Sequence, residues 1–305
     1  MVETDPPIEQ QLVTVRDWLR YAVSRFAAAK LAFGHGTATA YDEAAFLILS
    51  ALHLPIDTLE PWLDARLLPA ERLAVREVIE KRIATRKPAP YLTNEAWAGG
   101  QAFYVDERVI VPRSYIAELL AGDGLASILG DASAVGSILD LCTGSGCLAI
   151  LAALAFQDGQ VDASDVSPDA LAVAARNVAD YGLEDRVSLV TSDLFEGLAG
   201  RRYDLILANP PYVSAAAVAA FPPEYAAEPT IAHAGGADGL DIVRRILAEA
   251  GTHLEPGGHL IVEVGAGRDL IEQAYPSLPF LWLDTEESTG EVFAIEATGL
   301  RTSAS

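Results

Sequence analysis

A run of four residues, Asn209-Pro210-Pro211-Tyr212, places hydrogen-bond acceptors beside an aromatic ring. The prolines stiffen the chain and carry no N–H group, so the carbonyls there are left as acceptors. The carbonyls of the Asn209 side chain and of Pro210 could together accept both hydrogens of a planar –NH2 group. Tyr212 could stack on that plane and face a cation. The alternative is a rigid proline turn with a buried tyrosine, so the neighbouring motifs decide between the two.

A glycine-containing turn lies upstream, at Asp140-Leu141-Cys142-Thr143-Gly144-Ser145-Gly146. Glycines let the backbone approach a ligand closely, and the helix that starts after them offers unpaired N–H groups. The turn is not a P-loop, because the Gly-Lys-Ser/Thr sequence is missing. The dinucleotide fingerprint is also incomplete, since Ala149 stands at its third glycine. Alanine is tolerated there, so this turn alone leaves a nicotinamide-dependent dehydrogenase open.

Two acidic residues, Asp165 and Asp193, follow the next two predicted strands. In sheets of this topology, an acid about twenty residues after the glycines accepts hydrogen bonds from ribose hydroxyls. Asp165 stands at that distance. It could instead cap a helix, but Ser167 and Asp169 lie nearby and can do so in its place. Asp193 repeats the pattern, where we expect it to meet an adenine amine while Leu194 packs on the ring.

Alternating strands and helices from about residue 137 onwards put these motifs at strand ends. Short apolar runs predict buried strands, and longer periodic runs predict helices. Two late strands, 280–284 and 291–295, could pair as a hairpin. The alternation predicts an α/β fold with a doubly wound sheet. The remaining predicted strands are 138–141, 160–165, 187–190, 203–208 and 258–264, and the predicted helices are 147–156, 169–181 and 240–254.

The chain before this region has a helical pattern. Apolar residues recur every three to four positions over 15–26, and Asp42 is predicted to cap a helix over 43–52. A third helix, 69–86, is rich in Arg and Lys, and its basic face is either solvated or turned to an acidic neighbour. Strands are predicted over 91–113 around a Gly-Gly turn. We therefore divide the chain into a helical domain (1–90), a β-hairpin linker (91–115) and an α/β domain (116–305).

Charge is distributed unevenly along the 305 residues. Residues 1–115 carry 13 basic and 15 acidic side chains, and residues 116–305 carry 8 and 28, a net charge of −20. A domain with this much negative charge repels phosphate backbones and favours a basic protein partner. The alternative is that the acidic residues only aid solubility. The two cysteines, Cys142 and Cys147, support neither a disulfide framework nor a metal site. Without a signal-peptide pattern or a long apolar run, we expect a cytoplasmic protein.

These motifs resemble those of class I (Rossmann-like) methyltransferases that act on planar amino groups. That class includes nucleic-acid amino-base methyltransferases and the HemK-type protein-(glutamine-N5) methyltransferases. The helical N-terminal region favours the HemK-type family, as do three motifs: Val111-Pro112-Arg113-Ser114, Glu228-Pro229 and Gly235-Gly236-Ala237-Asp238-Gly239-Leu240.

Within the family, the branch that methylates a glutamine of large-subunit ribosomal protein L3 is similar at four places. Its motif after the arginine has proline where this chain has Tyr115. The branch that methylates class I release factors differs more, because it usually has Gly where this chain has Cys142. The four similar places are Gly34-His35-Gly36-Thr37, Tyr91-Leu92-Thr93-Asn94, 111–114 and 140–147.

The resemblance implies S-adenosyl-L-methionine as the methyl donor. Cys142–Gly146, together with Asp140, would surround its methionine part, Asp165 its ribose, and Asp193 with Leu194 its adenine. Asn209 and Pro210 would orient a glutamine amide, beside the donor, with Pro211, Tyr212 and Arg113 completing the acceptor side. No residue is required as a general base, and His35 is expected to be structural or to face the substrate.

Ribosomal protein L3 is the substrate that the resemblance favours. The GGQ glutamine of release factors is the alternative within the family. Two other classes remain open: an enzyme acting on a flipped or single-stranded nucleic-acid base, and a non-catalytic adenosine-binding module. The helical domain is expected to choose the protein substrate, and we expect neither a membrane partner nor duplex nucleic acid.

Overall fold

The computed structural model describes residues 6–122, 124–130 and 132–302. The chain forms two compact units. The first consists of Met1–Glu95 together with Pro222–Ala227, and the second of Ala96–Phe221 together with Glu228–Ser305. The predicted division had a separate linker over residues 91–115 and an unbroken α/β domain over 116–305. The two units instead divide the linker after Glu95, and residues 222–227 belong with the helices. The N-terminal residues 1–5 lie outside the described residues.

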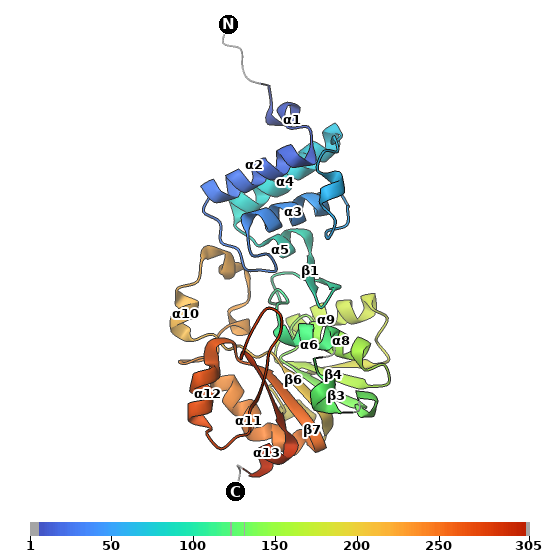
Figure 1. Cartoon of the computed structure of the whole chain (residues 1–305), viewed down its shortest axis with the longest axis vertical. Helices are drawn as coiled ribbons and strands as arrows, with labels where there is room; N and C mark the ends of the chain where they lie inside the picture. The colour runs from blue at the N-terminus through green and yellow to red at the C-terminus, as the bar shows by residue number, and fades with distance from the viewer. Residues whose placement is uncertain (1–5, 123, 131, 303–305) are drawn as a thin grey trace. The chain divides into compact units, whose positions relative to one another are not determined.

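The first unit is built from helices that pack around one apolar core (Figure 1). Helix α2 begins with a capping box in which Thr14 accepts from the N–H of Asp17 and Asp17 accepts from the N–H of Thr14. The core includes Trp18, Phe26 and Ile48, none of which is exposed. The helices are α1 (Ile8–Gln11), α2 (Val15–Ala28), α3 (Ala40–Ala51), α4 (Pro69–Thr85) and α5 (Ala89–Thr93), with 3-10 turns η1 (Glu60–Trp62) and η4 (Pro223–Ala227).

Two local predictions for this region are wrong. Asp42 does not cap the second long helix; Thr39 does, accepting from the N–H of Asp42, so the helix begins three residues earlier. Within the region 91–113 that was predicted as strands, residues 91–93 belong to helix α5, because Pro90 in a first helical turn needs no N–H partner, and residues 105–113 form no strand. The hairpin itself is present as β1 (Glu95–Ala98) and β2 (Gln101–Tyr104), joined by two glycines at φ of 54° and 75°.

The second unit is a seven-stranded mixed sheet in the order β5-β4-β3-β6-β7-β9-β8. The first five of these strands are parallel, and β9 is antiparallel to both β7 and β8. The predicted α/β class and late hairpin are confirmed. The strands are β3 (Ser137–Leu141), β4 (Gln160–Asp165), β5 (Val187–Thr191), β6 (Tyr203–Ala208), β7 (Leu254–Glu263), β8 (Leu281–Leu283) and β9 (Val292–Glu296).

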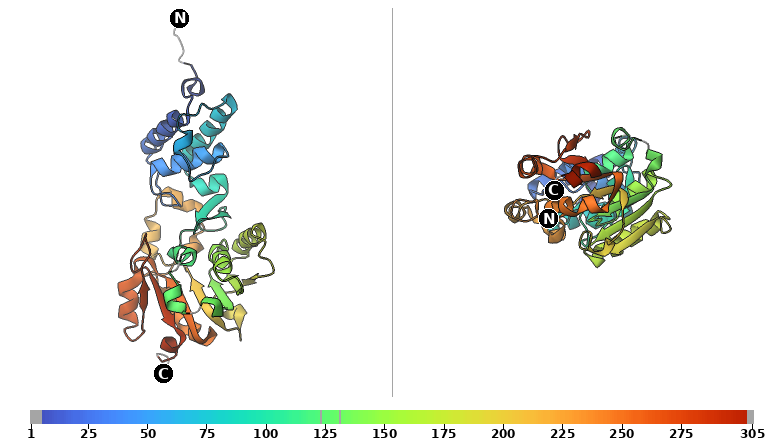
Figure 2. Two further views of the ribbon diagram at one scale, coloured as in Figure 1. Left: turned by 45° about the vertical axis from the view of Figure 1, so that its right-hand side comes forward. Right: turned by 90° about the horizontal axis from the view of Figure 1, so that it is seen from below.

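Helices cover both faces of this sheet (Figures 1 and 2). Because neighbouring strand residues point to opposite faces, Ile138 joins a core with α6, α8 and α9, whereas Leu139 joins a second core with α11, α12 and α13. The helices are α6 (Tyr115–Ala121), α7 (Ala126–Leu129), α8 (Cys147–Ala155), α9 (Pro168–Asp180), α10 (Ala215–Ala219), α11 (Asp241–His253), α12 (Arg268–Ala274) and α13 (Ala297–Thr302).

Short 3-10 turns complete this second unit. They are η2 (Ala132–Ala134), η3 (Glu196–Leu198), η5 (Thr230–Ala232) and η6 (Gly265–Gly267). Throughout the described part of the chain, every helix is too short or too polar to cross a membrane.

Candidate active site

The strand register of the second unit brings the sequence motifs to one edge of the sheet. Leu141 at the end of β3 pairs with Ala208 of β6 on one side and with Ser164 of β4 on the other. Asp165 in turn pairs with Thr191 of β5. Four adjacent parallel strands therefore end at the same carboxyl edge of the sheet. This edge carries the turn after β3, the acids after β4 and β5, and the Asn-Pro-Pro-Tyr motif after β6. Open α/β sheets bind ligands at such an edge.

The turn after β3 has an unusual backbone, with positive φ at Cys142 (57°), Gly144 (56°) and Gly146 (80°). A non-glycine residue rarely adopts such a φ, so Cys142 is held there by its surroundings. Asp140 supplies part of that support, because one oxygen, Oδ2, accepts from the Thr143 hydroxyl at 2.5 Å and from the N–H of Ala149 at 3.0 Å. These bonds shape the loop expected to surround the methionine part of the donor.

The second oxygen of Asp140 makes this loop suited to a cationic ligand. Asp140 is 1% exposed, and its Oδ1 is buried without a hydrogen-bond partner among the described residues. Burial raises the pKa of this carboxyl to about 7. An unpaired buried acceptor is costly unless a donor reaches it, and an ammonium group would stabilise the ionised form. The residues present therefore fit a ligand that carries an amino group.

The two cysteines are not candidates for a nucleophile. Burial raises the pKa of both the Cys142 and the Cys147 thiol, with nearby carboxylates adding to the effect. The thiolate is the reactive form, and at neutral pH both groups stay protonated. Cys142 therefore acts as a loop residue, and Cys147 as the first residue of the buried helix α8.

Asn177, which sequence reasoning missed, ties the turn to the β-hairpin. Its side-chain N–H group donates to the carbonyls of Ser145 at 2.8 Å and Tyr104 at 3.0 Å, while its oxygen accepts from the N–H of Tyr104 at 2.7 Å. Asn177 is 1% exposed, on the apolar face of α9. A polar residue on an otherwise apolar helix face was the available indication.

Asp165 lies beside the turn and already accepts two backbone hydrogen bonds. They come from Gly144 N–H at 2.9 Å and Ser167 N–H at 2.9 Å, and burial raises the pKa of the carboxyl. Ser167 caps α9 by accepting from the N–H of Ala170, so the predicted capping role falls to it. Asp165 thus fixes the turn and keeps lone pairs for further donors.

The third acid, Asp193, is paired with Arg245 of α11 at 3.0 Å, with both side chains more than 40% exposed. A paired carboxylate still has acceptor positions for an amino group. Leu194, at φ of 49°, is only 5% exposed and belongs to the core that includes α11. Leu194 can therefore contact a ligand only through the small part of its side chain that is exposed.

The Asn-Pro-Pro-Tyr motif leaves its acceptors available. Within the described ranges, no residue donates a hydrogen bond to the side chain of Asn209 or to the carbonyl of Pro210, and Asn209 is partly exposed. The hydroxyl of Tyr212, in contrast, donates to Glu263 at 2.8 Å. Burial and this carboxylate raise the pKa of Tyr212, so the phenol stays neutral.

Glu263, at the end of β7, is a second residue that sequence reasoning missed. It is fully buried, and burial raises its pKa. Its other oxygen accepts from the Ser114 hydroxyl at 2.6 Å and from Tyr115 N–H at 2.9 Å. Proline, which the resemblance led us to expect at position 115, could not supply that N–H. The sequence feature that could have identified Glu263 is its position as a charged residue at the end of an apolar strand.

Glycines of the Gly235–Leu240 motif explain how the loop closes around Pro211 and Tyr212. A Cβ at Gly235 would lie 2.7 Å from the Pro211 carbonyl oxygen, and one at Gly239 would overlap the carbonyl oxygen of Tyr212. A Cβ at Gly265 would lie 2.7 Å from the Tyr212 ring. The loop can therefore pack on the motif only where side chains are absent.

Arg113 is engaged by a buried carboxylate of the same loop. Its two terminal nitrogens lie 2.7 Å and 2.8 Å from the oxygens of Glu228, which also accepts from Val111 N–H at 3.0 Å and lies 2.9 Å from His233 Nε2. Such a bidentate pair fixes geometry as well as charge. Arg113 thus holds residues 111–113 against the loop that follows Tyr212.

Comparison with known proteins gives consistent results. The family model of the methyltransferase small domain matches residues 121–221. Two curated relatives carry the name ribosomal protein uL3 glutamine methyltransferase. The protein of Bordetella pertussis is 56% identical over 293 residues, which cover 96% of this chain and 98% of its own. That of Neisseria gonorrhoeae is 57% identical over 286 residues, covering 94% and 95%.

A solved structure also resembles the chain. The hMettl16 catalytic domain in complex with MAT2A 3'UTR hairpin 1 has a TM-score of 0.51 over 91% of this chain and 90% of its own, with 13% identity. At that identity the likeness shows the fold alone.

Proposed function

The chain belongs to the family of ribosomal protein uL3 glutamine methyltransferases, and we propose that it transfers a methyl group from S-adenosyl-L-methionine to the side-chain amide nitrogen of a glutamine in ribosomal protein uL3 (L3). The observation that carries the proposal is the unpaired acceptor pair of Asn209 and Pro210 at the same sheet edge as a loop suited to a cationic ligand.

The donor would be held by the turn after β3 and the acids that follow it. The buried, unpaired oxygen of Asp140 would take its amino group, with Cys142–Gly146 as the loop around its methionine part. Asp165 would accept from the ribose hydroxyls, and Asp193 from the adenine amine with Leu194 at its edge. When bound, the donor supplies an electrophilic methyl group on a sulfonium.

The acceptor amide would be positioned by the Asn-Pro-Pro-Tyr motif. An amide nitrogen is a weak nucleophile because its lone pair is delocalised into the carbonyl. Two fixed acceptors, Asn209 Oδ1 and the Pro210 carbonyl, would hold its N–H groups and favour charge that develops on nitrogen. Pro211 would fix the turn, and Tyr212, held by Glu263, would keep its ring beside the reacting atoms. Water can take the proton, so no protein base is needed.

The first unit is proposed to choose the protein substrate. It holds none of the donor-site motifs, and it contains the Gly34–Thr37 and Tyr91–Asn94 stretches. The net charge of −20 over residues 116–305 would attract a basic ribosomal protein and repel duplex nucleic acid. Arg113 would contribute to substrate binding through the segment that it holds. We place the reaction in the cytoplasm, where newly made ribosomal protein is found.

Radiolabelled methyl transfer to purified proteins tests this proposal. The enzyme is offered ribosomal protein uL3 and a class I release factor, each with a matched form in which the candidate glutamine is replaced. We expect label on uL3, lost when its glutamine is replaced. Equal or stronger labelling of the release factor would overturn the substrate, and labelling of nucleic acid alone would overturn the reaction as well.

A further inference from the structure

The loop that follows the Asn-Pro-Pro-Tyr motif does not stay within one unit. Residues up to Phe221 belong to the second unit, residues 222–227 to the helical unit, and the chain from Glu228 to the second unit again. We refer to residues 222–227 as the inserted segment. Its six residues are surrounded by parts of the chain that lie between about 130 and 195 positions earlier in the sequence.

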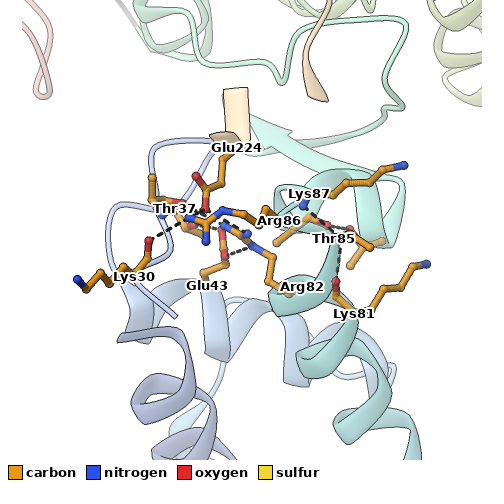
Figure 3. Close-up of polar contacts among 12 residues, drawn as sticks. Lys30, Thr37, Glu43, Lys81, Arg82, Thr85, Arg86, Lys87 and Glu224 are labelled. Carbon is orange, nitrogen blue, oxygen red and sulfur yellow. Dashed lines mark hydrogen bonds and ion pairs between the residues drawn. The ribbon is translucent and has the colours of Figure 1, made fainter. Parts of the chain in front are cut away.

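A buried ion cluster holds the inserted segment (Figure 3). The side chain of Glu224 is not exposed, and one of its oxygens lies 2.6 Å from Arg86 Nη2, accepts from Ala32 N–H at 3.0 Å and lies 3.8 Å from Arg82 Nη1. Arg82 is also paired with Glu43 at 2.6 Å. Arg82, Glu43 and Glu224 are buried and the Arg86 side chain is 31% exposed, so removing one partner leaves an uncompensated charge in a largely buried cluster.

The Gly34–Thr37 stretch forms the other half of this attachment. The Tyr225 ring lies with its centroid 4.2 Å from that of His35. Gly34 has a φ of 124°, and a Cβ there would lie 3.1 Å from the Tyr225 hydroxyl, so a side chain at this position would press on the inserted segment. Thr37 donates to Glu43 at 3.2 Å, which links the stretch to the ion cluster. The motif therefore has a physical role that donor binding does not use.

Both ends of the same loop are fixed in the second unit. Before the inserted segment, Val213 forms a bridge with Ala234, and Gly235 N–H donates to the carbonyl of Val213 at 2.9 Å. After it, Glu228 binds Arg113 and His233. The loop is thus attached at its ends next to the acceptor motif and at its middle in the unit expected to choose the substrate.

We infer that Glu224 is a positioning residue for methyl transfer: it holds the inserted segment in the helical unit and thereby fixes the loop that carries the acceptor-orienting motif. This inference rests on the proposed function. The alternative is that Glu224 only stabilises the helical unit, in which case its loss would act on stability and leave the chemical step unchanged.

Glu224→Gln in the full-length protein tests the inference, with Glu43→Gln as the matched control. Both variants remove one carboxylate from the same buried cluster, but only Glu224 lies on the inserted segment. We expect kcat to fall at least tenfold for Glu224→Gln, with the donor Kd within about twofold of the parent by calorimetry. For Glu43→Gln we expect kcat within about threefold, because Glu224 still has Arg86 and Ala32 N–H as partners when Glu43 is changed. A tenfold fall corresponds to ~1.4 kcal/mol of barrier.

Two results would overturn the inference: a kcat for Glu224→Gln within about threefold of the parent, or equal losses in the two variants. If Glu224→Gln does not fold, Tyr225→Ala decides by the same two criteria, since it loosens the inserted segment without changing charge. All values are ratios to the parent on whichever protein the parent methylates. If the proposed substrate is wrong, the parent enzyme itself will fail to methylate it. If the proposed role of Glu224 is wrong, the parent will be active and only the ratios of the variants to the parent will differ from those expected.

Discussion

The donor side and the acceptor side of the active site are held together in different ways. On the donor side, most supporting hydrogen bonds join residues within 21 positions of each other: Asp140 with Thr143 and Ala149, and Asp165 with Ser167 and Gly144. Asn177 is the exception, since its partner Ser145 lies 32 positions earlier. On the acceptor side, supports come from far away.

There, Tyr212 depends on Glu263, 51 positions later, and Arg113 on Glu228, 115 positions later. The donor loop is thus held mainly by residues near it in sequence. The acceptor loop is held by strands and loops that are distant in sequence. Substitutions on the two sides should consequently affect different measurements.

The largest effect is expected at the acceptor side. Asn209→Ala should abolish turnover and leave donor affinity largely intact, because the role proposed for Asn209 is to orient the acceptor amide and its side chain has no hydrogen-bond partner among the described residues. Single-turnover methyl transfer and calorimetry measure the two properties. A rate loss below tenfold, ~1.4 kcal/mol, would show that Asn209 is not the orienting group.

The next largest effect is expected on donor binding. Asp165→Ala should weaken donor binding by ~1.5–3 kcal/mol, since the ribose hydroxyls lose a charged acceptor. Calorimetry with the donor is the measurement, and Asp169→Ala, on the exposed first turn of helix α9, is the control. Unchanged affinity in Asp165→Ala would remove this residue from the donor site.

Glu263→Gln should disturb the residues that hold the acceptor side of the site and leave donor binding unchanged. The Ser114 hydroxyl and Tyr115 N–H both donate to one buried oxygen and Tyr212 to the other. An amide that keeps its oxygen toward Ser114 and Tyr115 places its N–H2 group against the Tyr212 hydroxyl, which must then accept a hydrogen bond instead of donating one. We expect ~1–3 kcal/mol less stability in urea unfolding and slower transfer, with the donor Kd unchanged. Loss of donor affinity in this variant would contradict the separation of the two sides.

A pH dependence is expected from Asp140 in the absence of donor. Its folded pKa of about 7 lies above the unfolded value near 3.9, so between these values the folded state binds the extra proton. Stability should therefore decrease as pH rises from about 4 to about 7, by up to ~1.4 kcal/mol per pH unit from this group.

Asp140→Asn should remove that decrease. The difference in urea midpoint between the parent and this variant, followed from pH 5 to pH 7, is the measurement. A difference that stays constant over this range would show that the carboxyl does not titrate there.

The smallest expected effect concerns substrate capture. Raising salt from 50 to 200 mM should lower kcat/KM for a basic protein substrate by a few fold, because exposed charges are screened within a Debye length of roughly 10 Å. The donor affinity, measured in parallel, serves as the control. A kcat/KM independent of salt would mean that the acidity of residues 116–305 does not steer the substrate.

The sequence by itself was sufficient for the fold class, the seven strands of the sheet, the longer helices and the motifs at strand ends, whereas the short helices α1, α5, α6, α7, α10, α12 and α13 were not predicted. These depend on periodicity and on spacing along the chain, and the glycine turn, Asp165 and Asn209–Tyr212 each follow a strand within a few residues. Its local errors were Asp42 as a helix cap and strands at residues 91–93 and 105–113. At residue 42 the error arose because Thr39 and Asp42 are both suitable caps for one helix.

Only the tertiary structure decided which side chains support the site. Glu263, Asn177 and Glu224 are polar residues without a distinctive spacing, and each acquires its role from a partner at least 32 positions away. The physical reason is that a buried polar group must find hydrogen-bond partners, and the partners it finds depend on which strands and loops are neighbours in space. The sequence determined the chemistry that the strand ends carry, and the packing of distant segments determined how that chemistry is held.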